Sequence, residues 1–129
     1  MAVVTGYLVR PKDRTIQEVT LVDEVKDPAG HLHNIYDMLE CRLITVVWLE
    51  NQINVIVDDE GLLHNPQHWI RIQGYHEVLA GNALFLGEPD KDGYSTSCPL
   101  SLDEIGSMVH CYTNGDDNWY AVQRLENSH

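Results

Sequence analysis

Residues 41–59 read CRLITVVWLENQINVIVDD, and this stretch decides the expected fold. The segment CRLITVVWLE is apolar at successive positions, so both of its faces can be buried, as in the central strand of a sheet. The segment QINVIVDD alternates apolar and polar residues and directs Ile53, Val55 and Val57 to one side. Because the polar residues ENQ separate the two segments, the stretch predicts a tight β-hairpin.

The segment before this hairpin, VKDPAGHLHNIYDMLE at residues 25–40, has a helical period. Leu32, Ile35, Tyr36 and Leu39 stand at positions i, i+3, i+4 and i+7, which is the apolar stripe of an amphipathic helix. We therefore expect this helix to pack on the sheet.

The two ends of the chain supply further strands. Residues 4–10 and 15–22 are rich in β-branched residues and are separated by PKDR, which predicts a second hairpin. Near the other end, the NG dipeptide predicts a turn followed by an edge strand in residues 114–126.

The region between the hairpins and the tail predicts one more strand and one more helix. The run EVLAGNALFLG reads as an apolar strand, in which Gly81 indicates a bulge or a close backbone approach. Residues 101–112, SLDEIGSMVHCY, begin with Ser101 and Glu104 at the spacing of a capping box and predict a short helix. The chain is therefore expected to form one α+β domain, residues 1–129, with a mainly antiparallel sheet and two short helices.

Composition limits the class of protein. The 129 residues are 43% hydrophobic and 22% charged, which is ordinary for a soluble domain, and no apolar run approaches the roughly 20 residues of a membrane span. The N-terminus lacks the pattern of a secretory signal, so a cytoplasmic protein is expected. Cys41, Cys98 and Cys111 are odd in number and lack CxxC spacing, which favours a reducing compartment and buried thiols.

The charge of the chain is strongly acidic. Twenty Asp and Glu residues against eight Lys and Arg give a formal net charge of -12. Beyond Leu43 the only Lys or Arg residues are Arg71, Lys91 and Arg124. This balance disfavours direct binding of nucleic acid, because phosphate backbones are repelled, and it permits a protein partner with a basic surface.

The acidic segment DDEGLLHNPQHW follows the hairpin directly. Asp58, Asp59 and Glu60 precede Gly61, and this composition is typical of a tight turn in which Gly accepts a positive φ. A catalytic carboxylate pair would need one dry and one wet acid, which neighbours on an exposed turn do not provide. The sequence HNP further predicts that Asn65 caps a helical turn beginning at the proline.

The histidines suggest a metal site only weakly. His31 and His33 form an HxH pair, and His64 and His68 stand at i, i+4, which would place both rings on one face of a helix. No HExxH motif or cysteine at ligand spacing supports them, so no metal or other cofactor is predicted.

Other chemical motifs are incomplete. EPDKDG begins like an EF-hand loop, but Pro99 stands where the bidentate Glu is required, so a hairpin turn is expected there. The nucleophile elbow GxSxG and the phosphate-binding loops GxGxxG and GxxxxGK are absent. We therefore expect the protein not to be an enzyme.

The segment HWIRIQGYH is the best candidate for binding a small ligand. Trp69 and Tyr75 can stack on a base while Arg71 pairs with a phosphate, although the packing of an ordinary strand explains the same residues.

Several of these pieces resemble a family of small proteins of unknown function carried by bacteriophages, plasmids and other mobile elements. In that family a strand ends in an acidic Glu-Gly turn followed by Asn, and Glu60, Gly61 and Asn65 stand at the matching places. AGNALFLG and LSLDEI match a later strand and a closing helix, so the resemblance covers residues 32–105. It implies no known reaction and favours an accessory protein that binds host machinery.

Three functions follow as hypotheses. The first is a non-enzymatic, acidic accessory protein in the host cytoplasm that binds and modulates a host protein, including as an anti-defence factor. The second is a protein that sequesters a nucleotide signal, and the third is a DNA mimic, which the clustering of the acids in turns makes less suitable. The sequence specifies no oligomeric state. The candidate binding residues are Asp58, Asp59, Glu60, Asn65, Trp69, Arg71 and Tyr75.

Overall fold

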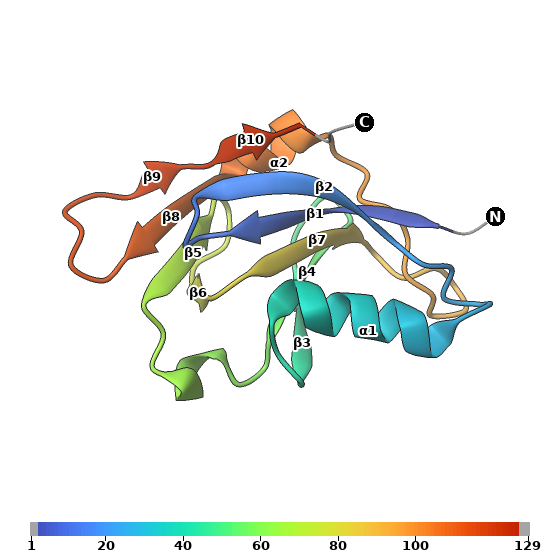
Figure 1. Cartoon of the computed structure of the whole chain (residues 1–129). Helices are drawn as coiled ribbons and strands as arrows, with labels where there is room; N and C mark the ends of the chain where they lie inside the picture. The colour runs from blue at the N-terminus through green and yellow to red at the C-terminus, as the bar shows by residue number, and fades with distance from the viewer. Residues whose placement is uncertain (1–2, 127–129) are drawn as a thin grey trace.

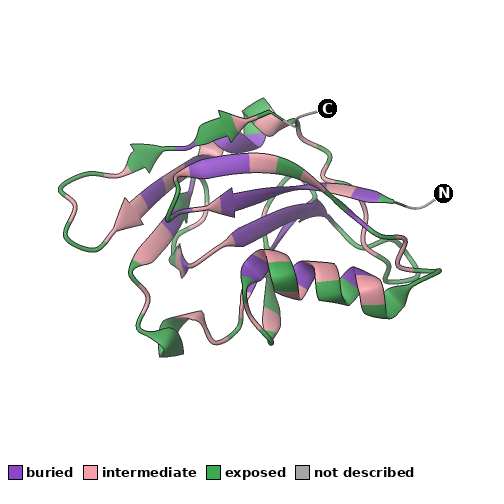
Figure 2. Ribbon diagram, in the orientation of Figure 1, coloured by how far each residue is buried: buried purple, intermediate pink, exposed green. Residues whose placement is uncertain are grey.

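The centre of the fold is strand β7 (Ala83–Gly87), which is buried along its whole length in this computed structural model. The structure describes residues 3–126. β7 lies between β1 (Val4–Arg10) and β4 (Ile53–Asp58) and pairs antiparallel with both. Figure 2 shows these inner strands mostly buried and the outer elements more exposed.

These three strands belong to a six-stranded sheet with the order β10-β2-β1-β7-β4-β3. All neighbours are antiparallel except β10, which runs parallel to β2. The remaining members are β2 (Thr15–Leu21), β3 (Ile44–Trp48) and β10 (Gln123–Leu125).

A second sheet has four antiparallel strands in the order β6-β5-β8-β9. Its members are β5 (His68–Ile72), β6 (Val78–Ala80), β8 (Val109–Thr113) and β9 (Tyr120–Ala121). The helices are α1 (Pro28–Leu39), α2 (Leu102–Met108) and the 3-10 helix η1 (Gly61–His64).

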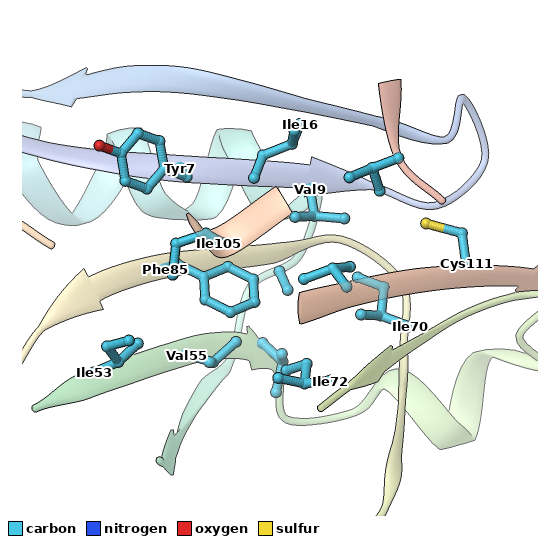
Figure 3. Packing of buried hydrophobic residues seen from close by; sticks show 14 residues of the cluster. Tyr7, Val9, Ile16, Ile53, Val55, Ile70, Ile72, Phe85, Ile105 and Cys111 are labelled. Carbon is cyan, nitrogen blue, oxygen red and sulfur yellow. The ribbon is translucent and has the colours of Figure 1, made fainter. Parts of the chain in front are cut away.

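Two apolar clusters hold these layers together. Helix α1 covers one face of the six-stranded sheet (Figure 1), where Ile35 and Leu39 pack with Leu84 and Leu86 of β7. The opposite face packs on α2 and the second sheet, and there Phe85 belongs to a larger cluster that Figure 3 shows from close by. The prediction of an α+β fold with a mainly antiparallel sheet is therefore confirmed.

The two predicted hairpins form, but the roles within the second are reversed. Its apolar segment is the outermost strand β3, with Val46 and Trp48 exposed, and not a central strand as expected. β4 takes the inner position, because it pairs with β7 on its other side. The strand of this hairpin that is buried on both faces is thus β4, which has a neighbouring strand on each side.

The predicted strand around Gly81 is in fact two strands that belong to different sheets. β6 lies in the four-stranded sheet and β7 in the six-stranded sheet, and Gly81 between them has a φ of 81°. Its left-handed conformation turns the chain from one layer to the other, which is not the bulge that the sequence suggested.

Both predicted helices are present, but α2 is shorter than expected and α1 buries a partly different set of side chains. On α1, Ile35 and Leu39 are buried as expected, but Leu32 is exposed and His31 is buried in its place. The predicted capping box of α2 is confirmed by reciprocal hydrogen bonds between Ser101 and Glu104. The helix nevertheless ends at Met108, and the residues that follow it form β8. Among residues 3–126, neither helix has the length and apolar character that crossing a bilayer would require.

The contact between β1 and β7 leaves no room for a side chain at Gly6. A Cβ atom at this position would lie 2.5 Å from Leu86 Cδ2 and 2.7 Å from the Phe85 carbonyl oxygen. Since the carbonyl belongs to the backbone, Gly6→Ala is expected to lower the free energy of unfolding by about 1 to 3 kcal/mol in a urea titration. Gly61→Ala is the matched control: its Cβ would meet Ala80 at an ordinary 3.4 Å, so a comparable loss there would contradict this explanation.

Burial also sets the reactivity of Cys111. Loss of solvent around the thiol raises its pKa to about 11, although Arg14 acts in the opposite direction. At pH 8.5 the folded protein therefore keeps this thiol protonated, and alkylation by iodoacetamide should be roughly a hundredfold slower than in urea. Mass spectrometry of the modified peptides measures the difference. Equal rates in the folded and unfolded states would show that Cys111 is accessible.

Candidate functional site

The acidic segment after β4 forms a turn that its own side chains stabilise. The Glu60 amide donates to Asp58 Oδ1 at 2.8 Å, and the Asp59 amide donates to the Leu43 carbonyl at 2.9 Å. Asp58 is partly buried, whereas Asp59 is exposed. The interpretation of DDEG as a turn is thus confirmed, and Asp58 has a structural role in it.

After this turn, the helical turn and Asn65 follow one another in the reverse of the predicted order. The helical turn is η1, which precedes Asn65, and Asn65 ends it with a φ of 53°. Asn65 is therefore not an N-cap, and the left-handed conformation expected at Gly61 occurs at Asn65 instead. Asn tolerates this conformation because its short polar side chain can bond locally.

The helix η1 turns the chain back on itself and brings His64 to the acids. His64 Nε2 lies 3.9 Å from both Asp58 Oδ2 and Glu60 Oε1, and one ligand atom from each of the three residues fits within 4.8 Å. Three such ligands can hold a divalent cation, with other positions left for water. The His64 side chain is 57% exposed, so the cluster is open to solvent.

The histidine pairs suggested by spacing do not form. His68 Nδ1 is hydrogen-bonded to Thr113 Oγ1 at 2.8 Å, and η1 ends before His68. His31 is buried with its ring nitrogens near the Val22 carbonyl and Ser95 Oγ, whereas His33 is exposed. Neither pair presents two free imidazoles on one side.

A shallow hollow adjoins the acidic turn. Its volume is about 260 Å³, and its lining includes Glu40, Asp58, His64, His68 and Asn82. This is smaller than the roughly 300 to 1,000 Å³ of pockets that enclose a small organic molecule. The turn also lines a second hollow of about 410 Å³ through Asp58, Asp59 and Gly61. It can therefore contact an ion, a partner's side chain or a small molecule.

A second surface lies on the outer side of the four-stranded sheet. Ile70 and Ile72 of β5 point into the large apolar cluster, so the alternation of a strand sends Trp69 and Arg71 to the opposite side. On β8, Cys111 is buried in that cluster. Its neighbours His110 and Tyr112, directly across from Arg71 and Trp69, therefore share the outer side.

The chain beyond β8 completes this surface with Trp119. The Trp119 ring lies 5.1 Å from the Tyr112 ring, and the Arg71 guanidinium lies 4.6 Å above the Trp119 ring. The Trp69 indole N–H donates to Asn114 Oδ1 at 2.8 Å. We call Trp69, Arg71, His110, Tyr112 and Trp119 the aromatic face.

The structure thus divides the predicted binding residues. Trp69 and Arg71 share the aromatic face, whereas Tyr75 packs against the apolar core with its hydroxyl 3.4 Å from Glu77 Oε1. Two residues of the aromatic face were not predicted to lie there. Tyr112 fell in the segment predicted as a helix, residues 101–112, and Trp119 fell in residues 114–126, predicted as a turn and an edge strand without an assigned neighbour. The alternation in VHCYT was the available signal.

Comparison with known proteins agrees with the coarse resemblance seen in the sequence. A family model described as a domain of unknown function (DUF3846) matches residues 4–112. The chain belongs to the DUF3846 family. The matched segment contains the acidic turn and four of the five residues of the aromatic face, while Trp119 lies beyond it. No curated protein and no solved structure matches the chain significantly.

The geometry of the acidic turn predicts unequal effects for its two aspartates. Asp58→Ala removes the acceptor of the Glu60 amide and should lower the free energy of unfolding by about 1 kcal/mol. Asp59→Ala, its matched control at an exposed position, should change it by less than about 0.5 kcal/mol. Chemical denaturation of both variants is the measurement, and equal losses would refute the structural role of Asp58.

Proposed function

We propose that this DUF3846 protein is a non-enzymatic binding protein that engages a host protein through the aromatic face. The observation that carries the proposal is the partly exposed group of Trp69, Tyr112, Trp119 and Arg71 on one side of a sheet. Trp, Tyr and Arg are the residues most enriched at the energetic centres of protein interfaces.

The side chains of this face are held in place before any partner arrives. Trp119 is packed on Tyr112, Arg71 is stacked on Trp119, and Trp69 is hydrogen-bonded to Asn114. Side chains that are already ordered lose less conformational entropy on binding. This arrangement favours recognition over a purely solubilising role.

The charge of the chain suggests the chemistry of the partner. With a net charge of -12, the protein attracts a basic surface over a distance of about 10 Å at moderate salt. Acidic turns such as Asp58–Glu60 supply charges that steer the encounter, while the aromatic face supplies the contact energy. The acids in these turns are not spaced in a regular row, which makes imitation of DNA a weaker explanation.

The proposal also includes where the protein acts and on what class of target. The resemblance to proteins of phages and plasmids supports an accessory protein that acts in the cytoplasm of a host cell, with a defence protein as one class of target. The open acidic turn and the absence of known catalytic motifs from the sequence support binding over catalysis.

One observation favours a nucleotide as the second candidate ligand of the same face. Among residues 3–126, Arg71 has no carboxylate partner, although it lies beside an aromatic ring. A base stacked on the aromatic face would bring its phosphate within reach of this guanidinium. The two candidates differ in ligand but use the same residues.

The proposal predicts that Arg71→Ala and Trp119→Ala weaken binding of a host protein captured from lysate by about thirtyfold each, the effect of losing roughly 2 kcal/mol. Calorimetry with the purified partner measures the dissociation constant. Tyr94→Ala, which removes an exposed ring elsewhere, is the matched control and should leave it unchanged.

Two outcomes distinguish the candidates. If both variants bind the partner as well as the original chain does, the aromatic face is not the interface. If no protein is retained at about 50 mM salt but a nucleotide raises the unfolding temperature, and Arg71→Ala abolishes that shift, the nucleotide function replaces the first.

A further inference from the structure

The edge strand β3 is unusually exposed for an apolar strand. Its sequence ITVVW contains no charge and no proline, the features with which sheet edges ordinarily avoid pairing with other chains. It is also longer than the other edge strands of residues 3–126, which have two or three residues. Such an edge is suited to hydrogen bonding with another strand.

Exposed apolar side chains gather around this edge. Six of the twelve exposed large hydrophobic residues described lie on or beside β3. Leu62, Leu63 and Val78 line a hollow of about 410 Å³ together with Thr45 and Val47. The six are Leu43, Val46, Trp48, Leu62, Leu63 and Val78.

The hydrogen bonds to β4 show which backbone groups of β3 are free. Leu49 donates to the Ile53 carbonyl, and the Leu43 carbonyl accepts from Asp59, so the odd-numbered residues bond toward β4. In an antiparallel pair these groups alternate in direction. Ile44, Val46 and Trp48 therefore direct their N–H and C=O groups to the open edge.

We propose that β3 pairs with β3 of a second copy of this chain, antiparallel and centred on Val46. In this register Val46 faces Val46 across a two-fold axis, and Ile44 exchanges hydrogen bonds with the partner copy's Trp48. An aromatic side chain opposite a β-branched one is a favourable cross-strand pair. The two six-stranded sheets become one continuous sheet.

The charges that flank β3 are complementary in the same register. Arg42 precedes the strand and Glu50 follows it, at equal distances in sequence from Val46. Both are exposed, and the antiparallel pairing brings Arg42 of each copy near Glu50 of the other. Within its own copy Arg42 lies 4.0 Å from Glu60, an exposed contact that it would exchange for Glu50 of the second copy. A shifted register would lose these two ion pairs, so the charges favour the register centred on Val46 over a shifted one.

Sedimentation equilibrium from about 1 to 500 µM tests the proposal, and we expect the original chain to dimerise with a roughly micromolar dissociation constant. Val46→Lys, which places two like charges at the axis, should raise that constant at least tenfold. Val22→Lys is the matched control, because Val22 and Val46 are both 38% exposed, and it should leave the constant unchanged.

A charge exchange tests the register itself. Arg42→Glu and Glu50→Arg should each weaken self-association, because each places like charges opposite one another. An equal mixture of the two variants should recover it, since the two acidic flanking positions of one variant then face the two basic positions of the other. A chain that stays monomeric throughout, a dimer unaffected by Val46→Lys, or a mixture that does not recover would each overturn the proposal. Circular dichroism establishes that every variant is folded.

Discussion

The burial of β7 on both of its faces is the constraint on which the other layers depend. Phe85 points to one side and Leu84 and Leu86 point to the other, so neither side can be left in water without losing apolar burial. Helix α1 covers one side of β7, and the second sheet covers the other together with α2. Gly6 on the adjacent strand makes room for Leu86, so the close approach of β1 and β7 depends on a residue without a side chain.

Local patterns predicted the elements that local interactions determine. The β1–β2 hairpin, the helical stripe of α1 and the capping box of α2 each depend on residues a few positions apart. The positions of β3 and β4 were exchanged, because the inner place is decided by pairing with β7, about thirty residues later in the chain. Hydrophobicity alone identified two apolar strands without showing which of them has a second neighbour.

The candidate site, too, was predictable only where interactions between nearby residues determine it. The turn at Asp58 was predictable, since its hydrogen bond spans two residues. The aromatic face was only partly predictable, because Trp69, Tyr112 and Trp119 come from three separate segments. Alternation predicts the side of a strand that a residue occupies, but not the strand that lies next to it. The resulting surface therefore became recognisable only once the pairing of β5 with β8 was known.

The pairing of β10 with β2 has a consequence for the newly synthesised chain. β2 is complete at Leu21, but its outer neighbour begins at Gln123, about a hundred residues later (Figure 1). At roughly 5 to 20 residues per second, the ribosome leaves this edge of β2 without its native neighbour for about 5 to 20 seconds. β10 covers only Thr15 to Gln17 of this edge. Exposed Glu18, directly beyond the covered part, discourages pairing with other chains both during that interval and in the folded protein.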